Sequence, residues 1–109
     1  MTWTLSNSGT TASLVINSET TLATDTNNAT FVVYIDTSNL TLGDILEVRL
    51  YVINLGGGSL TQVWKGTYQN AQIDPIKQTP FVASDQSFRA TLKQTAGTGR
   101  TYTWKYLRQ

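Results

Sequence analysis

The amino-acid sequence predicts an all-β protein: a single antiparallel β-sandwich of about six to eight short strands, with a jelly roll as one candidate arrangement. Three observations lead to this prediction. Apolar and polar residues alternate with period two in several segments, turn-forming residues separate these segments, and no window of helical length repeats apolar residues with the helical period. The 109 residues suffice for one domain. We expect residues 1–11 to form an N-terminal arm or edge strand and residues 12–109 to form the sandwich.

Residues 45–54 and 60–68 predict a first hairpin around the glycine-rich tract 56–59. In the first segment, alternation places four apolar side chains on one face: Leu46, Val48, Leu50 and Val52. In the second segment, the same rule places three side chains on one face: Leu60, Trp64 and Tyr68.

Residues 86–94 and 102–106 predict a second hairpin, with residues 96–100 as its turn. The apolar face of the first segment carries Phe88, Ala90 and Leu92. The apolar face of the second carries Tyr102, Trp104 and Tyr106.

The remaining segments give weaker patterns. Residues 30–36 form a continuous β-branched and aromatic run, which predicts a strand buried on both faces. Residues 12–16 and 20–24 predict short strands, and residues 2–5 an edge strand or arm. Two prolines interrupt the stretch after Tyr68, which predicts a loop or edge segment with brief pairing at residues 81–83.

Composition excludes several classes of function. Charged residues make up 14% of the chain, against about 25% in typical soluble domains, while Thr occurs nineteen times. The net charge is +1 and no basic run is present, so we expect neither nucleic-acid nor membrane binding. The absence of Cys and His removes catalytic triads and thiolate or imidazole metal sites, so we expect no cofactor and no metal. Little charge on an all-β surface is typical of a subunit that hides surface in an assembly, and equally of a Thr-rich β surface alone.

The seven carboxylates show no catalytic pairing, and we predict that the protein is not an enzyme. Glu47 lies beside Arg49, where a surface ion pair is expected, and Asp25, Asp44 and Asp85 lie at turn positions. The oxygen-rich segment 25–28 lacks the glycine and the final Glu of a calcium loop, which favours a turn. A hydrolase with two facing carboxylates remains an alternative.

The aromatic side chains at positions 64, 68, 102, 104 and 106 are in phase with apolar neighbours, which favours the core over a sugar-binding platform. Trp3 differs because it lies near the start of the chain. A large aromatic there is anchored either by its own domain or by a partner, and the sequence leaves both readings open.

Taken together, the chain resembles the small all-β virion proteins of tailed bacteriophages, in particular those that decorate or cement the head. The resemblance is carried by the segments 43–49, 63–68 and 92–100, which with the flanking strands cover about the last two-thirds of the chain. It implies a subunit that binds the major capsid protein on the outer head surface, associates with copies of itself as a trimer, and stabilises the capsid. It also implies location in the virion after synthesis in the host cytoplasm, in line with the absence of a signal-peptide pattern.

The resemblance carries over no contact residues, so expected exposure selects the candidates for partner contact. They are Thr2, Trp3, Thr4, Leu5, Gly56, Gly57, Gly58, Thr98 and Arg100. Two alternatives remain open: another virion component such as a tail, connector or spike protein, and a carbohydrate-binding β-sandwich module with a glycan as its partner.

Overall fold

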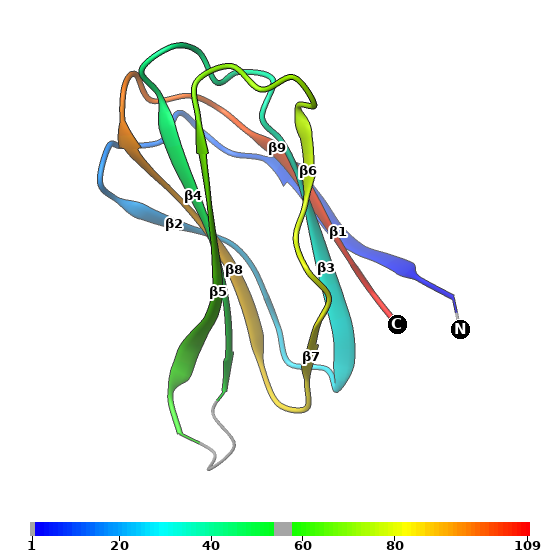
Figure 1. Ribbon diagram of the computed structural model, residues 1–109. Helices are drawn as coiled ribbons and strands as arrows, with labels where there is room; N and C mark the ends of the chain where they lie inside the picture. The colour runs from blue at the N-terminus through cyan, green and yellow to red at the C-terminus, as the bar shows by residue number, and fades with distance from the viewer. Residues whose placement is uncertain (1, 54–57) are drawn as a thin grey trace.

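The computed structural model describes residues 2–53 and 58–109 (Figure 1). Within these residues the chain forms nine β-strands, and no helix is long and apolar enough to cross a membrane. The strands are β1 (Thr4–Thr10), β2 (Glu19–Asp25), β3 (Ala29–Asp36), β4 (Ile45–Ile53), β5 (Leu60–Gln69), β6 (Ile76–Gln78), β7 (Val82–Ser84), β8 (Phe88–Ala96) and β9 (Thr103–Arg108). The predicted all-β class is confirmed.

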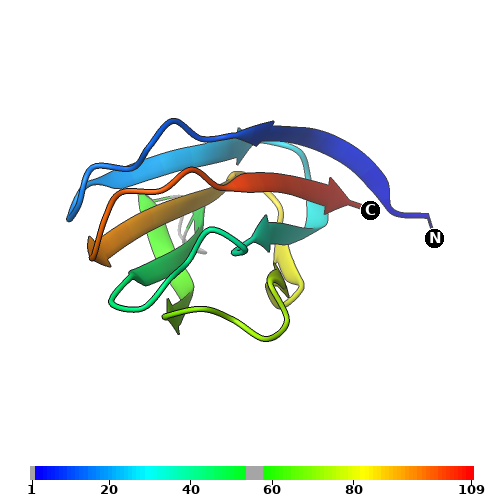
Figure 2. The ribbon, with the colours of Figure 1, turned by 90° about the horizontal axis from the view of Figure 1, so that it is seen from above.

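The strands pair as one long folded hairpin. β1 pairs with β9, β2 with β8, β3 with β6 and β7, and β4 with β5, all antiparallel. Rolling this hairpin up gives sheet A, in the order β1-β9-β3-β6 with β7 also on β3, and sheet B, in the order β2-β8-β4-β5. Figures 1 and 2 show the sheets as two layers, which confirms the sandwich. With β6 and β7 counted as one interrupted strand, the order is that of a jelly roll.

The inward side chains of both sheets form the core. Phe31 of β3 stacks on Phe88 of β8 with ring centroids 4.4 Å apart, and both are fully buried. The alternating apolar faces predicted for residues 46–50, 88–92 and 102–106 all point into this core. Residues 30–36 lie in β3, where even the outward Val32 is only 1% exposed, although Tyr34 is half-buried.

The predicted pairing of residues 86–94 with 102–106 is wrong. β8 lies in sheet B between β2 and β4, and β9 lies in sheet A between β1 and β3. The turn-forming residues between them carry the chain from one sheet to the other. Gly97 has a positive φ of 86°, and a Cβ there would lie 2.0 Å from Asp44 Oδ1, so the crossing requires glycine.

The predicted hairpin of residues 45–54 with 60–68 is confirmed by the pairing of β4 with β5, although Asn54 and residues 55–57 of its loop lie outside the described residues. The predicted common face of Leu60, Trp64 and Tyr68 is wrong at Leu60. Tyr51 is opposite Gln62 and Leu50 is opposite Trp64, so Val63 is an extra residue in β5. This bulge reverses the alternation, and Leu60 lies with Tyr51 on the outer face of sheet B.

Residues 12–16, predicted to be a strand, form an irregular connection instead. Leu14 is buried there, with its N–H bonded to the carbonyl of Arg100 at 3.1 Å. The segment crosses from sheet A to sheet B, and only Leu14 is buried there, because the neighbouring Val15 is 70% exposed. Residues 20–24 lie within β2 as predicted, and the brief pairing near 81–83 is present as β7.

Three edge strands each contain a β-bulge. The register shifts between Leu5 and Asn7 in β1, between Thr21 and Ala23 in β2, and at Val63 in β5. The fourth edge is divided into β6 and β7, which span three residues each. Bulges and short strands block edge-to-edge pairing. The fold therefore protects its edges by geometry where a charge-rich protein would use lysine.

Candidate functional site

The outer face of sheet A carries an apolar patch, here called the apolar face and defined by Trp3, Leu5, Val32, Phe81 and Leu107. Register places three of these residues in one row across the sheet, because Leu107 is opposite both Leu5 and Val32. Leu5 is 57% exposed and Phe81 is 61% exposed.

Trp3 and Phe81 form an aromatic pair over this face. Their ring centroids are 5.2 Å apart at an interplanar angle of 46°. Trp3 precedes β1 and Phe81 precedes β7, so the two rings reach toward each other across β9 and β3, the strands between them. This explains why the outward Val32 is almost fully buried. Trp3 is thus anchored by its own domain, while the outer side of the pair stays open.

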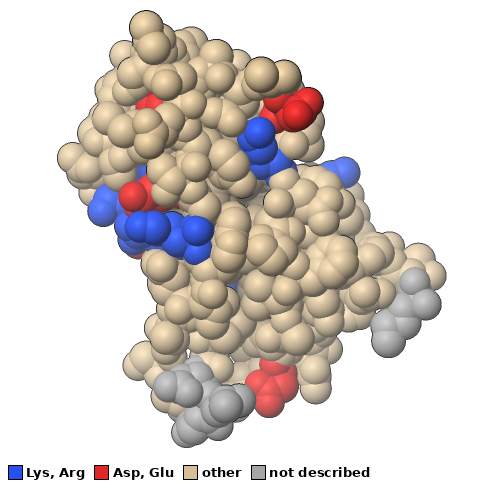
Figure 3. All heavy atoms as spheres, in the orientation of Figure 1, with Lys and Arg blue, Asp and Glu red and all other residues tan. Residues whose placement is uncertain are grey.

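The rest of the outer face of sheet A carries little charge. Lys105 lies over the ring of its cross-strand neighbour Tyr34, 5.2 Å from the centroid. Figure 3 shows that most of the surface in the view of Figure 1 carries neither basic nor acidic side chains.

The outer face of sheet B carries a charged network, here called the charged face and defined by Glu19, Glu47, Arg49, Lys65, Arg89 and Lys93. Arg49 of β4 bonds Glu47 at 2.6 Å and Glu19 of β2 at 3.4 Å, which confirms the predicted ion pair and extends it. Lys65 of β5 lies 4.0 Å from Glu47. These contacts link β2, β4 and β5 across the sheet.

Glu19 is the main acceptor of this network. Thr91 and Tyr51 donate hydroxyl bonds to its Oε2, and Arg49 donates to Oε1. Burial raises the pKa of Glu19, but these hydrogen bonds and the charge of Arg49 lower it more, so the pKa lies below its ordinary value. The Glu47 contact is the largest of the effects that raise the pKa of Arg49.

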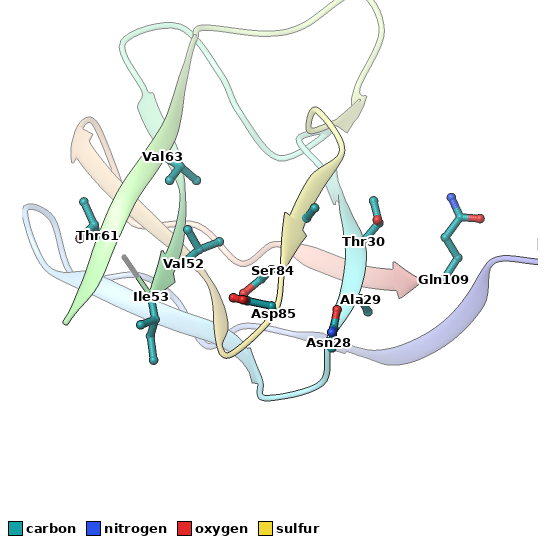
Figure 4. Close-up of a pocket in the computed structure, with 11 residues that line it drawn as sticks. Asn28, Ala29, Thr30, Val52, Ile53, Thr61, Val63, Ser84, Asp85 and Gln109 are labelled. Carbon is teal, nitrogen blue, oxygen red and sulfur yellow. The ribbon is translucent and has the colours of Figure 1, made fainter. Parts of the chain in front are cut away.

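A cavity of about 700 Å³ opens at one end of the sandwich (Figure 4). Val52 and Val63 line it from sheet B, and Ser84 and Asp85 face them from β7 and the turn after it. The cavity is large enough for a small molecule. Its lining contains Asp85 as the one titratable side chain among the described residues, so it lacks the paired groups that acid–base chemistry needs.

The opposite end of the sandwich holds two of the predicted contact residues, Thr98 and Arg100. Thr98 is exposed, but its N–H bonds Asp44 Oδ1 at 3.1 Å. The Arg100 Nε bonds Asp44 Oδ2 at 3.0 Å, and another guanidinium nitrogen bonds Thr41. The Arg100 side chain therefore holds the crossing between β8 and β9.

A buried amide completes this end. Gln94 is fully buried and donates to the carbonyls of Ala96 and Thr98, at 3.0 and 2.7 Å. Its Oε1 accepts from the Tyr102 hydroxyl at 2.9 Å. Burial and the nearby charge of Asp44 raise the pKa of Tyr102 to about 12.

Asp25 ends β2 directly before the turn to β3, and it also joins the two sheets. Its Oδ1 accepts from the Asn27 N–H at 2.8 Å, and its Oδ2 accepts from Tyr106 and Arg108 of β9, both at 2.9 Å. Burial raises the pKa of Asp25, and these hydrogen bonds lower it more, so the pKa lies below its ordinary value. In the part of the chain that the structure describes, no group of three metal-ligating side chains comes together, here or elsewhere.

The remaining predicted contact residues lie in two places. Thr2, Thr4 and Leu5 are exposed beside half-buried Trp3, and they adjoin the apolar face. Gly58 is exposed and lies two residues before β5, while Gly56 and Gly57 lie outside the described residues. Sequence reasoning missed Phe81 as a partner of Trp3; its one sequence signal is an aromatic beside a proline in a segment expected at an edge.

Comparison with known proteins finds no counterpart. No family model, curated protein or solved structure matches the chain.

Proposed function

We propose that this protein is a structural virion protein of a tailed phage, most specifically a decoration or cement protein that attaches to the outer surface of the head. The observation that carries the proposal is the apolar face, where exposed Leu5 and Phe81 flank the Trp3 pair on a domain with little charge. Attachment would bury these side chains against the major capsid protein and add contact energy at every copy.

The β-bulges in the edge strands support attachment through the face of a sheet. A subunit whose edge strands carry bulges at three of its edges cannot readily extend a neighbour's sheet. The remaining way to bury apolar surface is face-on docking, and the apolar face offers aromatic and aliphatic anchors without a buried charge. Association with two further copies around a local symmetry axis is part of the same proposal.

The jelly-roll order supports the proposal by analogy alone. Viral capsid domains use this arrangement, but lectin domains use it too, and a fold by itself does not determine a function.

The copy number of this protein in density-purified particles from its source, measured by quantitative mass spectrometry, tests the proposal. A copy number comparable with that of the major shell subunit is the expected result. A dozen copies or fewer, on the order of a vertex or tail ring with closed symmetry, would assign the protein to the tail, connector or spike. Complete absence from the particles would overturn the virion proposal.

A further inference from the structure

A hollow of about 350 Å³ lies on the charged face, away from the apolar face. It is lined by Glu19, Thr21, Tyr51, Leu60, Arg89 and Thr91, which come from β2, β4, β5 and β8. The bulge at Val63 contributes directly, because it turns Leu60 outward beside Tyr51. The wall therefore combines an aromatic ring and an aliphatic side chain with three hydroxyls, one carboxylate and one guanidinium.

Arg89 is the group in this hollow whose charge is not neutralised. The other arginine of the charged face, Arg49, is paired with two carboxylates, and Lys65 lies near Glu47. Arg89 has no ion-pair partner among the described residues, and its Nε is buried without a hydrogen-bond partner. This nitrogen is enclosed by protein atoms, so the terminal nitrogens of the guanidinium are the donors that a ligand in the hollow would meet.

The chemistry of the lining selects the ligand. A guanidinium binds a planar carboxylate through two parallel N–H bonds. Thr21 and Thr91 offer hydroxyls, and Glu19 Oε1 accepts from Arg49 only, which leaves an acceptor site on that oxygen. Tyr51 and Leu60 offer apolar surface for the face of a ring. A single cation without an ion-pair partner, beside hydroxyls and the Glu19 carboxylate, fits one carboxylate per ligand unit and fits a polyphosphate poorly.

We propose that this hollow binds one uronic acid unit of an acidic polysaccharide. Arg89 holds the carboxylate, Thr21, Thr91 and Glu19 hydrogen-bond the sugar hydroxyls, and the ring packs on Tyr51 and Leu60. The site lies on the sheet opposite the apolar face, so a subunit attached by that face presents the hollow outward. The binding itself does not depend on the virion assignment.

Titration of the purified protein with a short oligogalacturonide, followed by calorimetry and by NMR shifts of backbone amides, tests this proposal. The expected result is saturable binding with shifts centred on residues 19–21, 51 and 89–91, and no binding of a neutral glucose oligomer of equal length. Saturable binding that shifts residues elsewhere, equal binding of the neutral oligomer, or no binding by the folded protein would each overturn it.

Three variants separate recognition from general charge attraction. R89Q is expected to weaken binding at least about tenfold, and R89K by a similar factor because lysine lacks the planar fork. K65Q removes one positive charge from the same face outside the hollow, and a change below about twofold is expected at physiological salt. Equal weakening by R89Q and K65Q contradicts a built site, as does full affinity of R89K. A thermal melt of each variant verifies that it is folded.

Discussion

The two outer faces of this sandwich have the same architecture and different chemistry. On sheet A, outward positions carry Leu5, Val32 and Leu107 in a row, partly covered by Trp3 and Phe81. On sheet B, outward positions of three strands carry Glu19, Arg49 and Lys65 with their hydrogen-bond partners. Sheet A is therefore stabilised outwardly by apolar burial, and sheet B by charged and hydroxyl contacts.

The few charged side chains are distributed unevenly between the two faces. Four of the eight basic side chains lie on the charged face, at positions 49, 65, 89 and 93, while the apolar face contains none. Half of the basic side chains lie on one sheet, and Lys105 on the other sheet lies over the ring of Tyr34, so the apolar face itself can dock against protein without burying an unpaired charge.

Acid should destabilise the protein through its carboxylates and leave the apolar face unaffected. Asp25, Asp44 and Glu19 all have pKa values below their ordinary ones, since hydrogen bonds outweigh the effect of burial. A lowered folded-state pKa contributes stability above the unfolded pKa of about 4, and this stability is lost as the pH falls through the folded values. We expect the unfolding free energy to decrease as the pH falls from about 5 to about 2. Urea unfolding across this range measures it, and a flat profile would contradict the role assigned to these carboxylates.

Replacing Val32 by Thr should lower the unfolding free energy by about 2 kcal/mol, because it buries a hydroxyl under the roof of Trp3 and Phe81. The loss should be the same at pH 7 and at pH 4, since no titratable group lies in this row. Urea unfolding at both pH values checks the result. An unchanged unfolding free energy would mean that Trp3 and Phe81 do not exclude water from position 32.

The reverse exchange on the other sheet, Thr91 to Val, should cost about 1.5 kcal/mol at pH 7, because it removes a hydroxyl that donates to the charged Glu19. Here the loss should shrink as the pH falls and Glu19 becomes protonated. Urea unfolding at pH 7 and at several pH values below 4 measures it, because the lowered pKa of Glu19 requires such a pH for full protonation. If the loss is independent of pH, Glu19 is not the acceptor that gives the charged face its stability.

Replacing Lys65 by Gln should change the unfolding free energy by less than about 0.5 kcal/mol, because its contact with Glu47 spans 4.0 Å on a half-exposed side chain. Thermal melts at low and high salt check this expectation. A larger effect that disappears in salt would show that the network acts as one unit, which would strengthen the contrast between the two faces.

Local alternation was sufficient to predict the core strands. The period-two pattern of Leu46, Val48 and Leu50 predicted β4 and its inward face, because these residues meet a core that fills one side of the strand. Which strands pair with each other was harder to predict from the sequence. Nothing near residues 96–100 indicates that β8 pairs with β2 and β9 with β1, since a glycine-containing turn serves a hairpin and a crossing equally well.

The surface sites depended on features that a linear pattern does not contain. The bulge at Val63 leaves the spacing of Leu60, Trp64 and Tyr68 even in the sequence, so the outward turn of Leu60 had no visible sign. Trp3 was identified as a candidate contact by its position, but its partner Phe81 lies on a distant strand edge. The alternation of Phe88, Ala90 and Leu92 implies that Arg89 points outward, whereas the hollow around it forms only when β2, β4, β5 and β8 come together.

Docking through the apolar face is tested most directly by comparing the two faces in attachment. Particles from the source, prepared without this protein, are incubated with wild type, with a Leu5→Ser and Phe81→Ser double variant, or with a Gln62→Ser and Lys65→Ser double variant as the matched control on sheet B. Bound protein is measured by sedimentation and mass spectrometry after each variant has been shown to fold. We predict that the first double variant loses at least about tenfold in affinity, or about 1.4 kcal/mol, and that the second attaches like wild type. Equal attachment of both variants, or loss confined to the sheet B variant, would contradict docking through the apolar face.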